Sequence, residues 1–230
     1  MSTDDRSQAI VASGVIAVLP VERGEDVLPI AETIAEAGGG AVEVVPASLD
    51  LLGAIGQART RLGRSLHVGV GGVIGGDAAW EVIRAGAAFV ASPYLDPEVL
   101  RFCREEGVPA LPSALTPTEM AHARDLGAGL VKLFPAGAVG AAYVRWTLHA
   151  LAHLRVVVAG KMPAEKTGEF VLANATTIGV EIDTADGTGW QALREIGQRV
   201  RAYVDAVERA RGQVIRPAPS IRPIEGPDIR

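Results

Sequence analysis

Eight short aliphatic runs recur along the first 180 residues, and longer segments with apolar residues at helical spacing separate them. The runs cover residues 15–19, 41–45, 66–70, 88–91, 109–111, 130–134, 156–159 and 176–180. They are nearly continuous rather than alternating in polarity, which is typical of parallel strands that are buried on both faces. Hydrophobic residues make up 48% of the chain, so it can bury the large core that such a sheet needs.

The segments between the runs predict helices. Helical spacing of apolar residues is clearest in 25–37, 79–85, 97–106, 117–126 and 141–151. Glycine follows several of them, as it does at many helix C-termini: Gly38, Gly86, Gly107 and Gly127. Eight strand–helix units in about 200 residues predict an α/β fold, a single-domain (β/α)8 TIM barrel, rather than a doubly wound sheet.

The ends of the chain differ from the middle. We expect the barrel to span residues 11–211, after a polar and acidic N-terminal segment, 1–10. A tail rich in proline and arginine, 212–230, has little helical pattern and is expected to be extended.

The motifs of several cofactors are missing. No Gly-x-Gly-x-x-Gly sequence opens a helix after the first run, which argues against a dinucleotide cofactor. His149 and His153 are spaced to share a helix face, but no Asp, Glu or Cys stands nearby to complete a metal site. The one cysteine, Cys103, forms no disulfide framework within a chain. We therefore expect no cofactor and no metal.

Charge and hydropathy also limit the partners. The formal net charge of −5 provides no general attraction to nucleic acid or to acidic membranes. No apolar run reaches the roughly 18 residues expected of a membrane helix. Residues 1–8 are polar and acidic, unlike a secretory signal, so the expected location is cytoplasmic.

One lysine stands inside an apolar run. Of the 22 basic residues only three are lysines, and Lys132 lies within run 130–134. Arginine stays protonated in proteins, whereas a desolvated lysine can become the neutral amine that attacks a carbonyl. Lys132 is therefore the candidate for a Schiff-base nucleophile.

Glu43 stands in the second run in a similar setting. An ionised carboxylate inside an apolar strand is costly unless it is paired, and burial suits a carboxyl group to acid–base work. The reacting groups of (β/α)8 barrels lie at the carboxyl ends of the strands, so Lys132 and Glu43 are expected to share one site. A buried ion pair that only fixes strand packing is the structural alternative.

Six pieces of the sequence carry a family resemblance: 14–19, 42–44, 68–73, 91–95, 115–119 and 131–135. In order and approximate spacing they resemble the class I aldolases that cleave 2-keto-3-deoxy-6-phosphogluconate and 4-hydroxy-2-oxoglutarate. The resemblance covers roughly residues 10–205 and implies a (β/α)8 barrel, usually a homotrimer. It also implies that Lys132 is the Schiff-base lysine and that Glu43 is the acid/base, moving protons through a water.

The chain departs from this family around the substrate. Val45 and Ala47 stand where many members carry Thr and Arg, which help to hold the substrate's carboxylate, and Gly72 replaces a threonine. At the expected phosphate loop Lys161 replaces a glycine, and Glu181 would repel a phosphate at short range. Lys161 either restores a positive charge or pairs with Glu181. We therefore expect a non-phosphorylated and atypical carbonyl substrate.

The expected substrate-binding residues all follow or end a predicted strand: Val45, Ala47, Gly72, Pro93, Tyr94, Phe134, Ala159, Gly160, Lys161 and Glu181. Three functions stay open. The first is an aldolase-like lyase that makes or breaks a C–C bond next to a small-molecule carbonyl. The second uses the same lysine iminium for decarboxylation, dehydration or cyclisation in a biosynthetic pathway. The third is a barrel that has lost catalysis.

Overall fold

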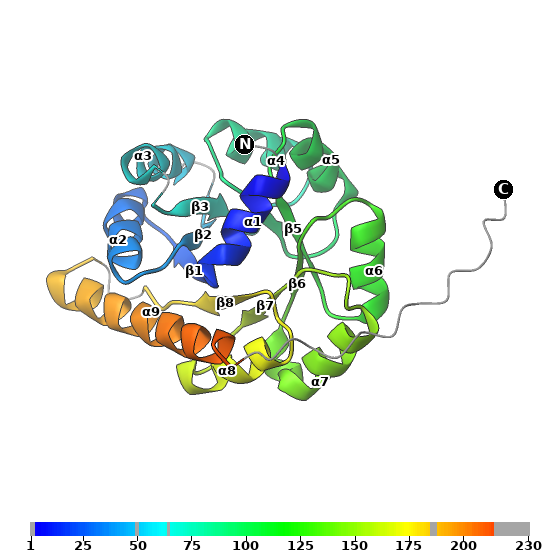
Figure 1. The fold of residues 1–230 in the computed structure, drawn as a ribbon. Helices are drawn as coiled ribbons and strands as arrows, with labels where there is room; N and C mark the ends of the chain where they lie inside the picture. The colour runs from blue at the N-terminus through cyan, green and yellow to red at the C-terminus, as the bar shows by residue number, and fades with distance from the viewer. Residues whose placement is uncertain (1–2, 49–50, 64, 185–187, 214–230) are drawn as a thin grey trace.

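The computed structural model describes residues 3–48, 51–63, 65–184 and 188–213 of the chain. Parallel strands close into one barrel in sequential order, with β8 pairing back to β1 (Figure 1). The strands are β1 (Val15–Val21), β2 (Ala41–Pro46), β3 (His67–Val70), β4 (Val90–Ser92), β5 (Ala110–Ala114), β6 (Val131–Leu133), β7 (Val156–Gly160) and β8 (Thr177–Glu181). The predicted (β/α)8 barrel is therefore confirmed. The predicted tail lies, from residue 214 on, outside the described residues.

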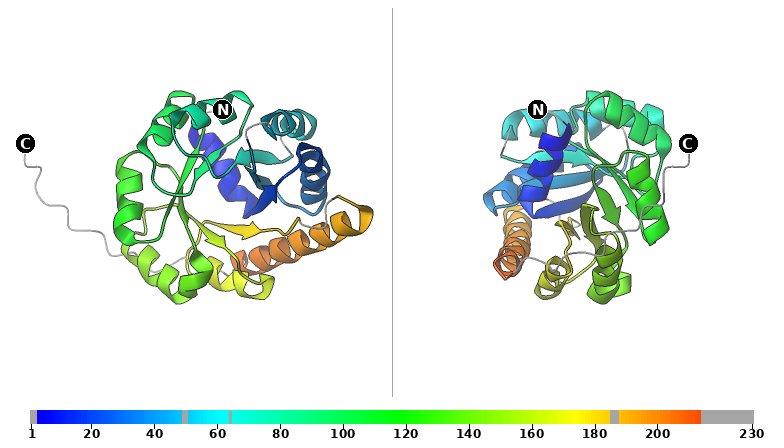
Figure 2. Two further views of the ribbon diagram at one scale, coloured as in Figure 1. Left: turned by 180° about the vertical axis from the view of Figure 1, so that it is seen from behind. Right: turned by 45° about the vertical axis from the view of Figure 1, so that its right-hand side comes forward.

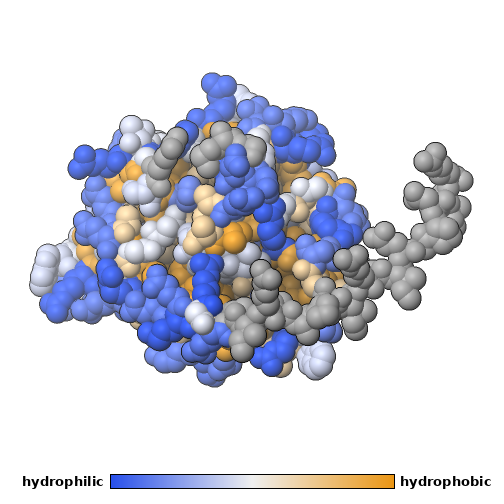
Figure 3. All heavy atoms as spheres, in the orientation of Figure 1, coloured by the Kyte–Doolittle hydropathy of each residue, from blue (hydrophilic) through white to orange (hydrophobic). Residues whose placement is uncertain are grey.

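Helices α2 to α9 surround the barrel, and α1 crosses one of its ends (Figure 1). Their bounds are α1 (Thr3–Ser13), α2 (Gly24–Glu36), α3 (Leu52–Leu62), α4 (Gly76–Arg84), α5 (Pro97–Glu105), α6 (Pro117–Asp125), α7 (Ala136–Ala150), α8 (Ala164–Leu172) and α9 (Trp190–Arg211). On the face shown in Figure 3 hydrophilic residues cover much of these helices. This is expected of helices whose apolar side packs on the strands.

Helix α1 covers the end at which the strands begin, and Figure 2 (left) shows the opposite end of the barrel. Ile10 of α1 is buried against Phe89 and other residues at the starts of the strands. Arg211 of α9 donates to the carbonyl of Val11 over 2.7 Å, which ties the two ends of the described chain together. Because α1 runs to Ser13, it joins the predicted N-terminal segment 1–10 to the first residues of the predicted barrel.

Phe89 fills the amino end of the barrel interior. It is fully buried, and a Cβ on Gly69 would lie 2.4 Å from its ring, so glycine leaves the room that the ring occupies. Close packing of this kind makes the amino end an apolar plug. The buried Glu43, Ser92, Ser113 and Lys132 lie toward the other end of the barrel, where they line one cavity.

Every predicted strand overlaps an observed one, but some boundaries move. The run at 109–111 extends to Ala114, because Ser113 lies in the ladder although it is polar. Helix α7 begins at Ala136, five residues before its predicted start at 141. Gly140 has a non-helical backbone with a φ of 77°, so it separates the first turn of α7 from the rest of the helix. It also interrupts the helical spacing of apolar residues, which is why the sequence predicted a later start.

Candidate active site

Lys132 and Glu43 meet inside the barrel. They come from β6 and β2, strands that lie on opposite sides of the closed sheet. The Nζ atom of Lys132 lies 2.6 Å from each carboxylate oxygen of Glu43. The two side chains are only 8% and 4% exposed, so water screens their attraction little. Short charge-assisted hydrogen bonds of this kind are strong, and each group offsets the cost of burying the other.

A glycine on the neighbouring strand end makes room for the carboxylate. A Cβ on Gly71 would lie 2.3 Å from Oε1 of Glu43, well inside contact distance. Glu43 can therefore reach toward Lys132 only because residue 71 has no side chain. The glycine-rich sequence after β3 thus positions the acid group.

A cavity of about 310 Å³ borders the pair at the carboxyl ends of the strands. This reaction cavity is lined by Val18, Pro20, Glu43, Val45, Gly72, Ser92, Pro93, Ser113, Lys132, Phe134, Ala159, Gly160 and Glu181. Its volume is at the lower end of the roughly 300–1,000 Å³ typical of small-molecule sites. A wall that is mostly aliphatic, with a few polar groups, keeps the local dielectric low.

Seven of the ten expected substrate-binding residues line this cavity: Val45, Gly72, Pro93, Phe134, Ala159, Gly160 and Glu181. Three do not. Ala47 is exposed after β2, where its N–H donates to the carbonyl of Val21. Tyr94 is half exposed and lies outside the lining. Lys161 is displaced outward because it follows the last residue of β7, and it lines a second cavity instead.

Four lining residues were not among the expected ones: Val18, Pro20, Ser92 and Ser113. Ser92 and Ser113 are both buried, and Ser113 is the in-register neighbour of Lys132 across the β5–β6 ladder. A serine inside the apolar run Ala110–Ala114 was the available signal for Ser113. Ser92 belongs to the 91–95 piece that carries the family resemblance.

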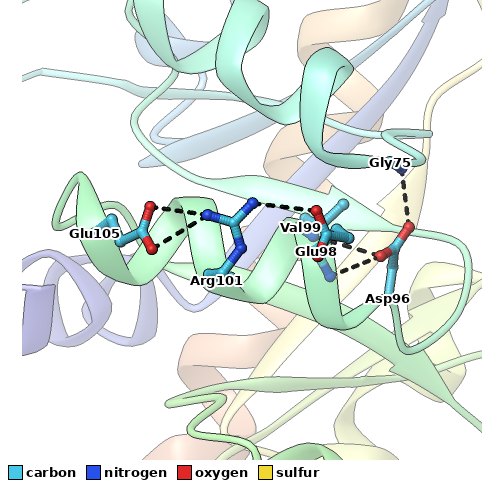
Figure 4. Close-up of polar contacts among 6 residues, drawn as sticks. All are labelled: Gly75, Asp96, Glu98, Val99, Arg101 and Glu105. Atoms are coloured by element: carbon cyan, nitrogen blue, oxygen red, sulfur yellow. Dashed lines mark hydrogen bonds and ion pairs between the residues drawn. The ribbon is translucent and has the colours of Figure 1, made fainter.

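Asp96 holds two of the loops that surround this cavity. Its Oδ2 accepts from the N–H of Gly75 over 2.9 Å, and its Oδ1 caps α5 through the N–H of Glu98 (Figure 4). Asp96 is the N-cap of α5, where a short acceptor side chain satisfies otherwise unpaired N–H groups. The loops after β3 and β4, which carry Gly72 and Pro93, are thus joined through one carboxylate.

The second cavity, of about 850 Å³, adjoins the first through Pro20 and Glu181, which line both. Lys161 Nζ lies 3.4 Å from Oε1 of Glu181. Of the two roles expected for Lys161, the structure therefore shows the ion pair. Further carboxylates of this cavity come from Glu22, Asp26 and Asp183.

Within the described ranges no group of three or more His, Cys, Asp or Glu is placed to hold a metal ion. His149 and His153 are both exposed, and each contacts a different neighbour, Trp146 and Arg124. Burial raises the pKa of the Cys103 thiol to about 12, which keeps it unreactive. Among the same residues, no helix is both long and apolar enough to cross a bilayer.

Fold and site together define a class of protein: the (β/α)8 barrels that hold a buried amine beside a carboxylate at the carboxyl ends of their strands. Residues 7–186 match the family model described as KDPG and KHG aldolase. The chain therefore belongs to this family of class I aldolase-type carbon–carbon lyases. The resemblance carried by the six sequence pieces is confirmed.

The similarity to individual relatives is low, as in a divergent member. The 2-dehydro-3-deoxy-phosphogluconate aldolase of Haemophilus influenzae is 26% identical over 84% of this chain and 92% of the relative. The aldolase of that name from Treponema pallidum is 35% identical over 58% of this chain and 63% of the relative. The solved 4-hydroxy-2-oxoglutarate aldolase/2-deydro-3-deoxyphosphogluconate aldolase from TTHB1 is 30% identical with a TM-score of 0.75, covering 88% of this chain and 98% of that one.

Proposed function

We propose that this protein is a class I aldolase-type lyase in which Lys132 forms a Schiff base with a small carbonyl compound. The observation that carries the proposal is the buried contact between Lys132 and Glu43 beside a cavity of about 310 Å³. Membership of an aldolase family supports it. Neither cofactor nor metal has a step in this chemistry, since the iminium itself withdraws the electrons.

The first half of the reaction forms the covalent intermediate. Glu43 accepts a proton from the ammonium group of Lys132, and the neutral amine attacks the carbonyl carbon. The new N–C bond forms as the π electrons move to oxygen, which takes a proton and becomes the carbinolamine hydroxyl. Loss of that hydroxyl as water leaves the iminium.

The second half breaks the C–C bond. The electron pair of the bond next to the iminium carbon moves toward nitrogen, giving an enamine and an aldehyde. Glu43 takes the proton that the substrate's hydroxyl loses and returns a proton to the enamine carbon. Water then hydrolyses the new iminium and frees Lys132, so no proton is gained or lost overall. The same steps in reverse make the bond.

We further propose that the substrate is not phosphorylated. Glu181 lies where the two cavities join, and its carboxylate would repel a phosphate bound there at short range. The charge of Lys161 is already offset by Glu181. Val45 presents an aliphatic side chain where a hydroxyl would hold a carboxylate, so a pyruvate-type acid also loses support.

The same iminium supports decarboxylation, dehydration or cyclisation, and the second candidate function rests on this shared intermediate. The aliphatic wall of the reaction cavity favours such reactions as much as aldol cleavage, because it protects the enamine from water. Product analysis separates the two functions: aldol chemistry yields two carbonyl products, whereas the others yield one altered product.

We also propose a cytoplasmic homotrimer, as the family resemblance implies. Light scattering on the purified protein in dilute buffer tests the trimer, and a monomer at micromolar concentration would contradict it.

Borohydride trapping tests the central proposal. The protein is incubated with a panel of ketones and aldehydes, reduced, digested and analysed by mass spectrometry. We expect an adduct on the peptide that contains Lys132, its loss in Lys132→Ala, and its retention in the matched control Lys166→Ala, whose lysine is exposed on α8. An adduct that survives Lys132→Ala would disprove the assignment, and no adduct with any carbonyl would favour a barrel without catalysis.

A further inference from the structure

The hydroxyl groups of the two serines in the reaction cavity both donate hydrogen bonds to backbone carbonyls. Ser113 Oγ donates to the carbonyl of Ser92 over 2.8 Å. Ser92 Oγ donates to the carbonyl of Tyr94 over 2.8 Å. A hydroxyl has one proton and two lone pairs, so each serine now offers the cavity an acceptor and no donor.

The carboxylates in the lining of the reaction cavity also offer hydrogen-bond acceptors rather than donors. Glu43 and Glu181 are carboxylates, which accept hydrogen bonds when ionised and donate none. Lys132 is the one side chain of the lining with N–H groups, and Schiff-base formation uses that nitrogen. The side-chain wall of the reaction cavity therefore recognises donors on the substrate. A carboxylate next to the carbonyl would bring only acceptors and a negative charge toward Glu43 and Glu181.

Ser113 is well placed to recognise the group next to the carbonyl. It is the in-register partner of Lys132 on the neighbouring strand, and neighbouring strands lie about 4.8 Å apart. Both residues are 7% exposed and line the same cavity. A substituent on the carbon that bonds to Nζ would thus share this cavity with the Ser113 hydroxyl.

We propose that the substrate carries a hydroxyl group on the carbon next to its carbonyl, and that this hydroxyl donates to Oγ of Ser113. This inference rests on the proposed Schiff base at Lys132. A protonated amine in the same place would lie beside the cationic iminium and be repelled, whereas a hydroxyl is neutral. Ser113 is then a specificity-determining residue, which selects a hydroxyketone or hydroxyaldehyde over a 2-oxo acid.

Three ketones with one skeleton test the inference. Hydroxyacetone, acetone and pyruvate share a methyl ketone and differ in a hydroxymethyl, methyl or carboxylate group. Trapping at Lys132 is titrated with each in the wild-type protein. We expect hydroxyacetone to reach half-saturation at a concentration about tenfold below that of acetone, the worth of one good hydrogen bond. Pyruvate should require more than acetone.

Variants of Ser113 identify the source of the preference. In Ser113→Ala the tenfold advantage of hydroxyacetone over acetone should fall to about twofold. Ser113→Thr keeps the oxygen and should keep the preference. The ratio between two ketones in one variant is independent of how much protein folds, so a stability loss in Ser113→Ala does not obscure it.

The possible failures are distinct. Tightest trapping of pyruvate, or an unchanged ratio in Ser113→Ala, would overturn this inference and leave the Schiff base standing. Equal weakening of all three ketones in Ser113→Ala would show a structural role and would overturn it as well. No adduct with any of them would overturn the Schiff base at Lys132 and the inference with it.

Discussion

Two lysine–glutamate pairs stand at the carboxyl end of this barrel, and they share little beyond their residue types. The side chains of Lys132 and Glu43 are 8% and 4% exposed and make two contacts of 2.6 Å. Those of Lys161 and Glu181 are 84% and 39% exposed and lie 3.4 Å apart. Water and salt screen the outer pair, whereas the inner pair interacts in an apolar surrounding.

This difference shows that burial, rather than residue type, decides what such a pair can do. Direct contact and shielding from water suit Lys132 and Glu43 to pass a proton between them, whereas Lys161 and Glu181 are exposed and farther apart. The outer pair offsets its own charges at the edge of the second cavity. In the function proposed above, the inner pair supplies the chemistry and the outer pair disfavours a phosphate.

The largest effect is expected from breaking the inner pair. Lys132→Met leaves Glu43 buried without its cation, which should lower the free energy of unfolding by about 3–5 kcal/mol. The double variant Lys132→Met with Glu43→Leu should regain most of that loss, because no charge is then buried. Urea unfolding followed by circular dichroism measures both. A loss under 1 kcal/mol in the single variant would contradict a tightly coupled buried pair.

A smaller effect on stability, but a clear one on chemistry, is expected from Gly71→Ala. The new Cβ would lie 2.3 Å from Oε1 of Glu43 and must displace the carboxylate. Borohydride trapping should slow at least about tenfold, since a misplaced acid–base group loses much of its roughly 10²–10⁴-fold contribution.

Gly53→Ala is the matched control for this substitution. Gly53 lies on α3 with no atom within 4 Å of its added Cβ, so trapping should be unchanged. The protein should gain up to about 1 kcal/mol of stability from the helix propensity of alanine. Equal slowing in both variants would show that the position of Gly71 is not special.

Breaking the outer pair should change stability little. Lys161→Ala removes an exposed contact, so the free energy of unfolding should fall by less than about 1 kcal/mol. The difference in unfolding free energy from wild type should shrink further in about 0.5 M salt. Salt at that concentration shortens the Debye length to a few ångströms and screens the exposed pair. A loss comparable to that of Lys132→Met would remove the distinction between the two pairs.

The smallest effect should come from His67, whose ionisation is opposed by its partial burial. Desolvation lowers the pKa of His67 below its ordinary value, so the folded protein favours the neutral ring. The corresponding stability is complete above the unfolded pKa of about 6.5 and is lost as the pH falls toward the folded value. His67→Gln should therefore flatten the decline of the melting temperature below pH 6.5. An identical decline in both proteins would contradict a half-buried ring that stays neutral in the folded protein.

The barrel and the two charged residues of its centre were predictable, since both signals are local. A continuous apolar run predicts a buried strand whatever the rest of the chain does, and a charge inside it is conspicuous. Ser113 was predictable as an oddity in its strand, but its role was not. Its hydrogen bond to the carbonyl of Ser92 joins two strands. The spacing of residues within one segment does not predict which carbonyl a hydroxyl on another strand will bond to.

The position of Lys161 shows the same limit. The sequence motif predicted Lys161 at the end of β7, beside the substrate. It did not decide whether the charge of Lys161 is available to a ligand or is paired with Glu181. The fold directs it into the outer cavity and against Glu181. A one-residue step past the end of a strand changes which way a side chain faces, and the pattern of apolar residues does not specify that step.

The sequence by itself determined the strands, the helix ends and the two candidate catalytic residues. Each of these depends on a pattern among neighbours within a few residues. The contact between Lys132 and Glu43 joins positions 89 residues apart, and only closure of the sheet brings strands two and six to face each other. Packing between distant segments likewise decides three other features. These are the space beside Gly71, the hydrogen bonds that the hydroxyls of Ser92 and Ser113 donate, and the unequal burial of the two lysine–glutamate pairs.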